Sequence, residues 1–285
     1  MTASKSTATP RVAKAKPAAS TAKAIVKKDA SWYDYPEYYD AGFNTELWRE
    51  ADFFEKAFAK YVPFPVKRVF EPGCGSGRLI IEMAKRGYDM TGLDLSDAML
   101  GFCRDELKEK GLKARLIRGD MTDFRLTKPV DAAFNPINTF RHLLTEDAAR
   151  QHLQCVTDAL KPGGIYILGL HLCPRGCDYY GTERWQVKYG DAKIYYALTV
   201  VDSDLKTRVE RLRLTMTVKK PDEQFKLIDH LELRLYNAKQ LKELIASVPE
   251  LSIREVFDFW YDIEEPQKLN TTICDTVLVL QKAAE

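Results

Sequence analysis

The chain has 285 residues, of which 45% are hydrophobic and 11% aromatic, a composition typical of a globular enzyme and too apolar for a disordered protein. Its formal net charge is +2, but this charge is unevenly distributed. Residues 1–28 contain seven basic and no acidic side chains, and the remainder contains 36 basic and 41 acidic side chains. This mildly acidic remainder excludes a folded surface that coats nucleic acid. No apolar run approaches the roughly 18 residues of a membrane span.

Residues 1–30 consist mainly of Ala, Lys, Ser, Thr and Pro. We expect a disordered basic tail, which makes at most weak contacts with polyanions. The start of the chain lacks the apolar core of a secretory signal. The six scattered cysteines indicate reduced thiols instead of a disulfide framework. Together these features predict a cytoplasmic protein.

The next segment, residues 31–172, has the residue pattern of a folded domain. Five aromatic residues lie between positions 31 and 40, and apolar residues at helical spacing follow over 47–61, which predicts an N-terminal helical cap. From Val66 onward short apolar runs alternate with helical patterns, with strands expected at 69–70, 90–93, 114–117, 130–134 and 165–168. This alternation predicts an α/β core, with a doubly wound, Rossmann-like and mostly parallel sheet.

Residues 173–236 change to a period of two, which predicts an antiparallel β insertion over the substrate site. One face of its strands is apolar and the other polar. Arg211, Arg213 and His230 on the polar face are candidates for recognising a polar acceptor, although such side chains usually face water. Residues 237–285 then supply a final helix and two strands of the core.

The strongest chemical signal is the loop Glu71-Pro-Gly-Cys-Gly-Ser-Gly77, which follows a strand and opens a helix. Glycines permit a tight turn and a close ligand, while the helix start offers free N–H groups. Asp94 ends the next strand, where a carboxylate can accept both ribose hydroxyls of an adenosine. Asp120 and Asn135 end the third and fourth strands, although either could be only a turn residue.

Five segments in this order resemble the class I S-adenosylmethionine-dependent methyltransferases, in their small-molecule branch: 69–77, 92–96, 119–121, 134–138 and 160–164. The final helix and strands fit that family's reversed last strand. Glu71 is a departure, because the family more often has Asp there. Asn135-Pro136 resembles some N-methylating enzymes, whereas the residues that follow it resemble the small-molecule branch.

The resemblance implies that S-adenosylmethionine is the cofactor. Glu71, Gly73 and Gly75 then border its methionine half. Asp94 binds the ribose hydroxyls, and Leu95 lies beside the adenine.

The same resemblance assigns residues from later strands and from the cap. Asp120 accepts a hydrogen bond from the adenine amino group, and Met121 packs on the ring. Asn135 lies near the transferred methyl group, which makes it a catalytic candidate. Tyr39, or its neighbour Tyr38, closes over the cofactor.

His142 is a second catalytic candidate, since it follows the fourth strand and could act as a general base, although a lone His is more often structural. His171, Cys173 and Cys177 could form part of a metal site, but no fourth ligand stands at a usual spacing, so we predict no metal.

These features predict methyl transfer to a small-molecule acceptor, with no membrane and no nucleic-acid partner beyond weak contacts of the tail. One alternative is a methyltransferase acting on RNA or protein, with the tail as a docking arm. A nicotinamide-dependent oxidoreductase is a second alternative. The Gly-x-Gly-x-Gly spacing disfavours it, because such enzymes have Gly-x-Gly-x-x-Gly. A non-catalytic cofactor-binding protein is a third. The acceptor atom and the oligomeric state stay open.

Overall fold

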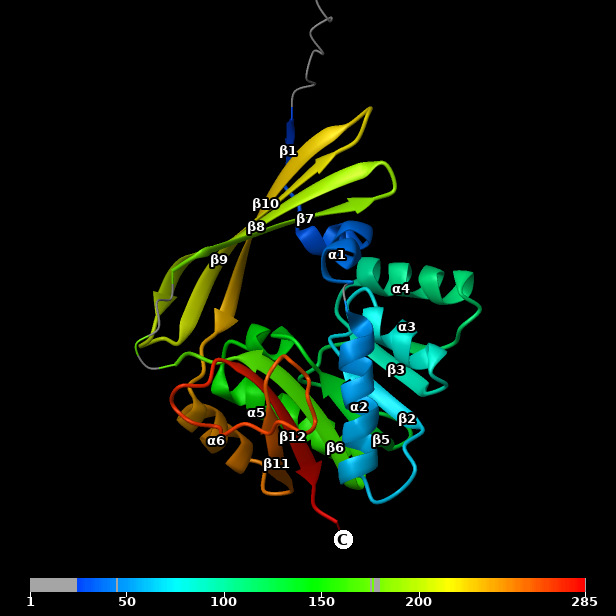
Figure 1. The fold of residues 1–285 in the computed structure, drawn as a ribbon, viewed down its shortest axis with the longest axis vertical. Coiled ribbons are helices and arrows are strands. Elements are labelled where there is room, and N and C mark those ends of the chain that lie inside the picture. The colour runs from blue at the N-terminus through cyan, green and yellow to red at the C-terminus, as the bar shows by residue number, and fades with distance from the viewer. Residues whose placement is uncertain (1–24, 45, 175, 177–179, 285) are drawn as a thin grey trace, which may run out of the picture.

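The computed structural model describes residues 25–284 except 45, 175 and 177–179. Two sheets organise these residues. The core sheet has seven strands in the order β11-β12-β6-β5-β2-β3-β4, and the cap sheet has five in the order β1-β10-β9-β8-β7. In Figure 1 the cap sheet stands at one end of the core, with α1 between them.

The core sheet is parallel except at one edge. Its parallel strands are β2 (Arg68–Pro72), β3 (Asp89–Asp94), β4 (Arg115–Arg118), β5 (Val130–Asn135) and β6 (Leu160–His171). β12 (Asp275–Lys282) pairs with β6 in the antiparallel direction, and β11 (Leu251–Phe257) pairs with β12 at the edge of the sheet. The strand order reverses between β2 and β5, the position where open α/β sheets bind ligands. The predicted doubly wound core with a reversed last strand is confirmed.

Helices cover both faces of the core sheet. One apolar cluster joins it to α2 (Leu47–Tyr61), α3 (Arg78–Lys85) and α4 (Asp97–Glu109), and another joins it to α5 (Glu146–Ala159) and α6 (Ala238–Ala246). Ser96 and Thr145 cap α4 and α5 by accepting hydrogen bonds from backbone N–H groups. The strand expected at 165–168 begins earlier, because Leu160 of β6 already pairs with Val130.

The cap consists of short N-terminal helices under an antiparallel sheet. Its elements are η1 (Trp32–Asp34), α1 (Pro36–Phe43), β7 (Thr182–Tyr189), β8 (Ala192–Asp204), β9 (Val209–Lys219) and β10 (Gln224–Arg234). Asp229 of β10 accepts hydrogen bonds from the Ser31 hydroxyl (2.6 Å) and the Trp32 N–H (3.2 Å). The Tyr196 hydroxyl of β8 donates to the Tyr38 carbonyl (2.5 Å). The insertion and the N-terminal helices therefore form one body.

The expected tail over residues 1–30 needs a correction. Residues 1–24 lie outside the described residues, but Val26–Lys28 form β1, which pairs in parallel with β10. The Lys28 ammonium lies 3.0 Å from the Glu223 carboxylate and 3.8 Å from the centre of the Phe225 ring. Composition alone could not predict this strand, because its pairing depends on an edge strand about 200 residues later in the chain.

No helix in the part of the chain that the structure describes combines the length and the apolar character needed to cross a bilayer.

Asp131 joins the amino ends of three core strands. One of its oxygens accepts from the N–H groups of Lys67 and Arg68, each at 2.8 Å, and the other pairs with the Lys161 ammonium. Burial of the carboxyl opposes ionisation, but Lys161 and the two backbone donors hold the pKa of Asp131 below its usual value.

We therefore expect Asp131→Ala to lower the free energy of unfolding by roughly 2–4 kcal/mol at pH 7, because charged acceptors contribute about 1.5–3 kcal/mol per hydrogen bond. Since the folded-state pKa is lowered, this contribution is present above the unfolded-state pKa and disappears as pH falls through the folded-state value. Urea unfolding at pH 7 and at about pH 3 measures both effects. The exposed Asp105→Ala is the control, and an equal loss in the two variants would contradict the assignment.

Candidate functional site

The glycine-rich loop after β2 is held against the end of β3. The N–H groups of Gly73 and Cys74 donate to the Leu93 carbonyl (2.6 and 3.0 Å), and the Gly75 N–H donates to the Asp94 carboxylate (2.8 Å). Gly73 has φ +68°, and a Cβ atom on it would lie 2.5 Å from the Thr139 side chain. The loop thus requires glycine at this position, and its backbone stays open to a ligand.

Asp94 connects the loop to the helix that follows it. Its second oxygen accepts from the Ser96 N–H (2.9 Å). Burial raises the pKa of Asp94, while the hydrogen bonds from Ser96 and Gly75 favour its ionised form. The neighbouring Leu95 leaves 64% of its surface exposed. A carboxylate and an exposed apolar side chain therefore stand together at the carboxyl end of β3.

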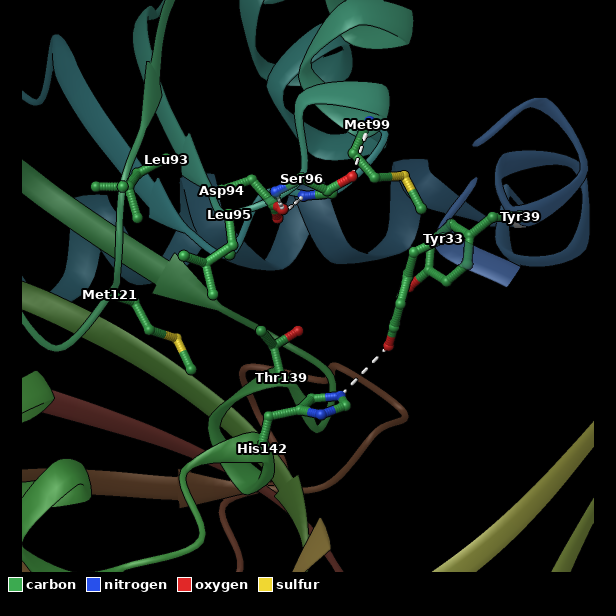
Figure 2. A pocket seen from close by; sticks show the side chains of 13 residues that line it. Tyr33, Tyr39, Leu93, Asp94, Leu95, Ser96, Met99, Met121, Thr139 and His142 are labelled. Atoms are coloured by element: carbon green, nitrogen blue, oxygen red, sulfur yellow. Dashed lines mark hydrogen bonds between the residues drawn. The ribbon is translucent and has the colours of Figure 1, made fainter. Parts of the chain in front are cut away.

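These residues line a pocket of about 270 Å³ at the point where the strand order reverses. Of the predicted site residues, it brings together Tyr39, Gly73, Gly75, Asp94, Leu95, Met121 and His142. Figure 2 shows Leu95 and Met121 on one side of the pocket, and Tyr33 and Tyr39 on the other.

A second pocket of about 170 Å³ adjoins the first and reaches the cap sheet. Both pockets are lined by Tyr33, Tyr39, Gly73, Gly75, Thr139 and His142. The second pocket also contains Glu71, whose side chain is buried and has one oxygen without a hydrogen-bond partner. Burial raises the pKa of Glu71 well above its usual value, and the nearby Arg78 partly offsets this. A positively charged ligand group would satisfy that oxygen.

His142 lies at the junction of the two pockets, at the end of η2 (Thr139–His142). Its Nε2 is 3.4 Å from the Tyr33 hydroxyl, and Figure 2 shows the two groups facing each other. The surrounding protein and the Arg141 charge lower the pKa of His142, so the ring is neutral at pH 7. Burial raises the pKa of Tyr33, which keeps its proton.

Two predicted residues line neither pocket. Asp120 accepts hydrogen bonds from the N–H and the hydroxyl of Thr122, each at 2.8 Å, in the manner of a turn residue. Asn135 is buried and donates to the Pro72 carbonyl (2.7 Å), while its own carbonyl oxygen lacks a partner. The ligand roles of both residues stay predictions. Of the two cap tyrosines, Tyr39 lines the pockets, whereas the ring of Tyr38 packs 6.1 Å from that of Phe225.

The polar face of the insertion does not meet the site. Arg211, Arg213 and His230 are exposed on the outer face, where Arg211 pairs with Asp202 (2.8 Å) and Glu232 (2.9 Å). Of the two alternatives that the sequence left open, the structure supports exposure to solvent over contact with an acceptor, and the inner, apolar face supplies the pocket wall. Within the described residues no cluster of three metal-binding side chains occurs.

Sequence reasoning missed several lining residues, notably Tyr33, Ser96, Met99 and Thr139. Tyr33 belongs to the aromatic run over residues 32–39, and Thr139 directly follows the fourth-strand motif, so both had a local signal.

Comparison with known proteins identifies the class. Residues 69–164 match the family model of the methyltransferase domain. A putative methyltransferase of Geobacillus sp. (strain WCH70) is 28% identical over 145 residues, which cover 50% of this chain and 56% of that protein. The dTDP-3-amino-3,4,6-trideoxy-alpha-D-glucopyranose N,N-dimethyltransferase of Streptomyces venezuelae is 29% identical over 100 residues, covering 35% and 40%. The matched region thus spans about half or less of these curated relatives.

The fold is shared over a longer stretch. The S-adenosylmethionine-bound structure of an amino pentose methyltransferase from Micromonospora echinaspora superposes with a TM-score of 0.69 at 19% identity, and covers 90% of this chain and 99% of that one. Residues 69–164 therefore match a methyltransferase domain, and the chain shares the fold of an S-adenosylmethionine-bound methyltransferase, as its motifs predicted.

We expect Asp94→Ala to weaken S-adenosylmethionine binding on the order of ten- to a hundredfold, because it removes an ionised acceptor and releases Gly75. Asp97→Ala is a matched control, since that exposed carboxylate lies three residues later and lines neither pocket. Isothermal titration calorimetry measures the affinity of both variants for S-adenosylmethionine, and NAD serves as a ligand that is not expected to bind. Equal affinities in the two variants, or NAD binding by the unaltered protein, would count against this site.

Proposed function

We propose that the protein transfers a methyl group from S-adenosylmethionine to a small-molecule acceptor. The observation that carries the proposal is the junction of the two pockets, which share six lining residues. The cofactor occupies the first pocket, and the acceptor enters the second, beneath the cap sheet. Such a junction brings both reactants together and excludes water.

The first pocket fits the cofactor by its chemistry. In this assignment the Asp94 carboxylate accepts the ribose hydroxyls, and Leu95 and Met121 contact the adenine. The methionine half extends from the first pocket into the adjoining part of the second, where the buried Glu71 oxygen that lacks a partner accepts from its amino group. Tyr39, whose ring lies 4.0 Å from the position of a Cβ atom on Gly75, covers the glycine-rich loop.

An amine is the acceptor group that the names of the relatives favour, since one N-methylates an amino sugar and another acts on an amino pentose. When bound, S-adenosylmethionine supplies an electrophilic methyl group on a positively charged sulfur. The amine lone pair forms the new bond to carbon while the carbon–sulfur bond breaks, and the electron pair of that bond stays on sulfur. Nε2 of His142 receives the proton that the amine loses, and Tyr33 orients the ring.

Cys74, Cys103 and Cys155 are free thiols. This agrees with the reduced thiols expected from the sequence, and it supports our proposal of a cytoplasmic enzyme.

We expect His142→Gln to lower kcat roughly 10²- to 10⁴-fold, the usual contribution of a general base, with unchanged affinity for the cofactor. Because the pKa of His142 is lowered, the unaltered enzyme should stay active at pH 7 and lose activity only as pH falls below the usual His range. Rates with an amine acceptor between pH 4.5 and 8 measure this. Tyr33→Phe should lower kcat less and should still lose activity as pH falls. If His142→Gln keeps that limb, another group is the base.

The main rival is methylation of RNA or protein through the basic tail. Because β1 begins at Val26, deleting residues 1–24 removes five positive charges and leaves every described strand intact. We expect the turnover of a small amine to stay within about twofold of the full-length value. Activity on RNA or protein that is salt-sensitive and disappears with the deletion would favour the rival.

A further inference from the structure

The cap sheet supplies one wall of the second pocket, and this wall consists of leucine side chains. Leu198 of β8, Leu212 of β9, and Leu231 and Leu233 of β10 all line it. Leu231 and Leu212 are direct cross-strand neighbours. Leu198 and Leu231 are only half-buried, so part of their apolar surface stays available to a ligand. We call these four residues the leucine wall.

The rest of the pocket continues this apolar surface. Trp32 and Phe43 of the N-terminal cap line it, and the centre of the Trp32 ring lies 4.9 Å from that of Tyr39 and 5.4 Å from that of Phe43. Ile137, between β5 and η2, lines the same pocket with 41% of its surface exposed. Apolar groups thus surround the acceptor region on the sides supplied by the cap sheet, the N-terminal cap and the core.

The pocket has little positive charge to offer. Among its described lining residues, Glu71, Arg78 and His142 are those with acidic or basic side chains. The Arg78 guanidinium is already paired with both oxygens of Glu50, and these side chains are 13% and 6% exposed. Partial desolvation by the surrounding protein and the adjacent Arg141 charge lower the pKa of His142, although the residue is exposed, so it adds little positive charge at pH 7.

The guanidinium next to this pocket is also neutralised. Arg141 lies 2.7 Å from the Glu210 carboxylate of β9 and donates to the Arg234 carbonyl (2.9 Å). A phosphate or carboxylate placed against this wall would therefore exchange its hydration for apolar contacts without gaining a paired cation.

We infer that the acceptor is an amine with an apolar body and no phosphate or carboxylate group, in contrast to the dTDP-linked amino sugar named for the Streptomyces relative. This inference rests on the function proposed above. Within it, the leucine wall and the ring of Trp32 hold the apolar body, and the amine points toward the junction of the two pockets, where His142 lies. Aromatic rings beside the junction also favour a group that is positively charged before it loses its proton.

The test is a binding series that does not depend on turnover. Protein saturated with S-adenosylhomocysteine is titrated calorimetrically with n-butylamine, n-hexylamine and n-octylamine, and separately with dTDP-glucose. We expect affinity to rise about threefold to fourfold per added methylene until the cavity is filled, which is the effect of burying one methylene group. Weak or undetectable dTDP-glucose binding completes the expected result. A flat series, or dTDP-glucose binding more tightly than n-octylamine, would overturn the inference.

Variants of β10 connect this effect to the leucine wall. Leu231→Ser should reduce the ratio of n-octylamine to n-butylamine affinity by about tenfold, with unchanged affinity for S-adenosylhomocysteine, which also reports that the variant is folded. Ile228→Ser on the outer face of the same strand is the matched control and should keep the full ratio. An equal effect of both substitutions would argue against the wall.

Turnover separates this inference from the proposed function. Release of S-adenosylhomocysteine from S-adenosylmethionine with n-octylamine supports both. A preference for a dTDP-linked amino sugar in turnover would overturn the acceptor class and leave the methyltransferase function in place. Chain-length-dependent binding with no release for any amine would instead overturn the proposed function.

Discussion

The hydrogen bond from the Gly75 N–H to the Asp94 carboxylate is the interaction on which the site depends. It fixes the glycine-rich loop to the end of β3, and the Ser96 N–H on the other oxygen fixes the start of α4 to the same group. A single carboxylate thus sets the distance between two backbone segments that border the cofactor pocket. Its position at the reversal of strand order follows from the topology of the core sheet.

A second set of contacts connects the core to the cap. Arg141 of η2 pairs with Glu210 of β9, while Arg234 of β10 and Arg208 both pair with Glu146 at the start of α5 (2.7 and 2.8 Å). Because Arg141 directly precedes His142, the cap sheet and the catalytic candidate share one anchor. The Arg141–Glu210 pair is buried, whereas the Glu146 side chain is 45% exposed, so the first pair is the contact that places η2 against β9. The acceptor pocket and the proposed base are therefore held in one arrangement.

The two pockets differ in the residues that line them. The first pocket is lined by loops of the core, which carry backbone donors and the carboxylate of Asp94, and by Tyr33 and Tyr39 of the N-terminal cap. The second pocket has three sources of side chains, namely the core, the N-terminal cap and the insertion, and most of those side chains are apolar. Substitutions in the cap sheet can thus alter the second pocket without changing any residue that lines the first.

The sequence by itself determined the doubly wound core, the glycine-rich loop and the position of Asp94, because strand periodicity, glycine and a strand-end acid are local signals. It also determined that each strand of the insertion has one apolar and one polar face. Only the tertiary structure decided which face meets the pocket, since a period of two defines two faces but not their direction. The pairing of β1 with β10 and the approach of Tyr33 to His142 likewise join residues more than 100 positions apart, which no local pattern can predict.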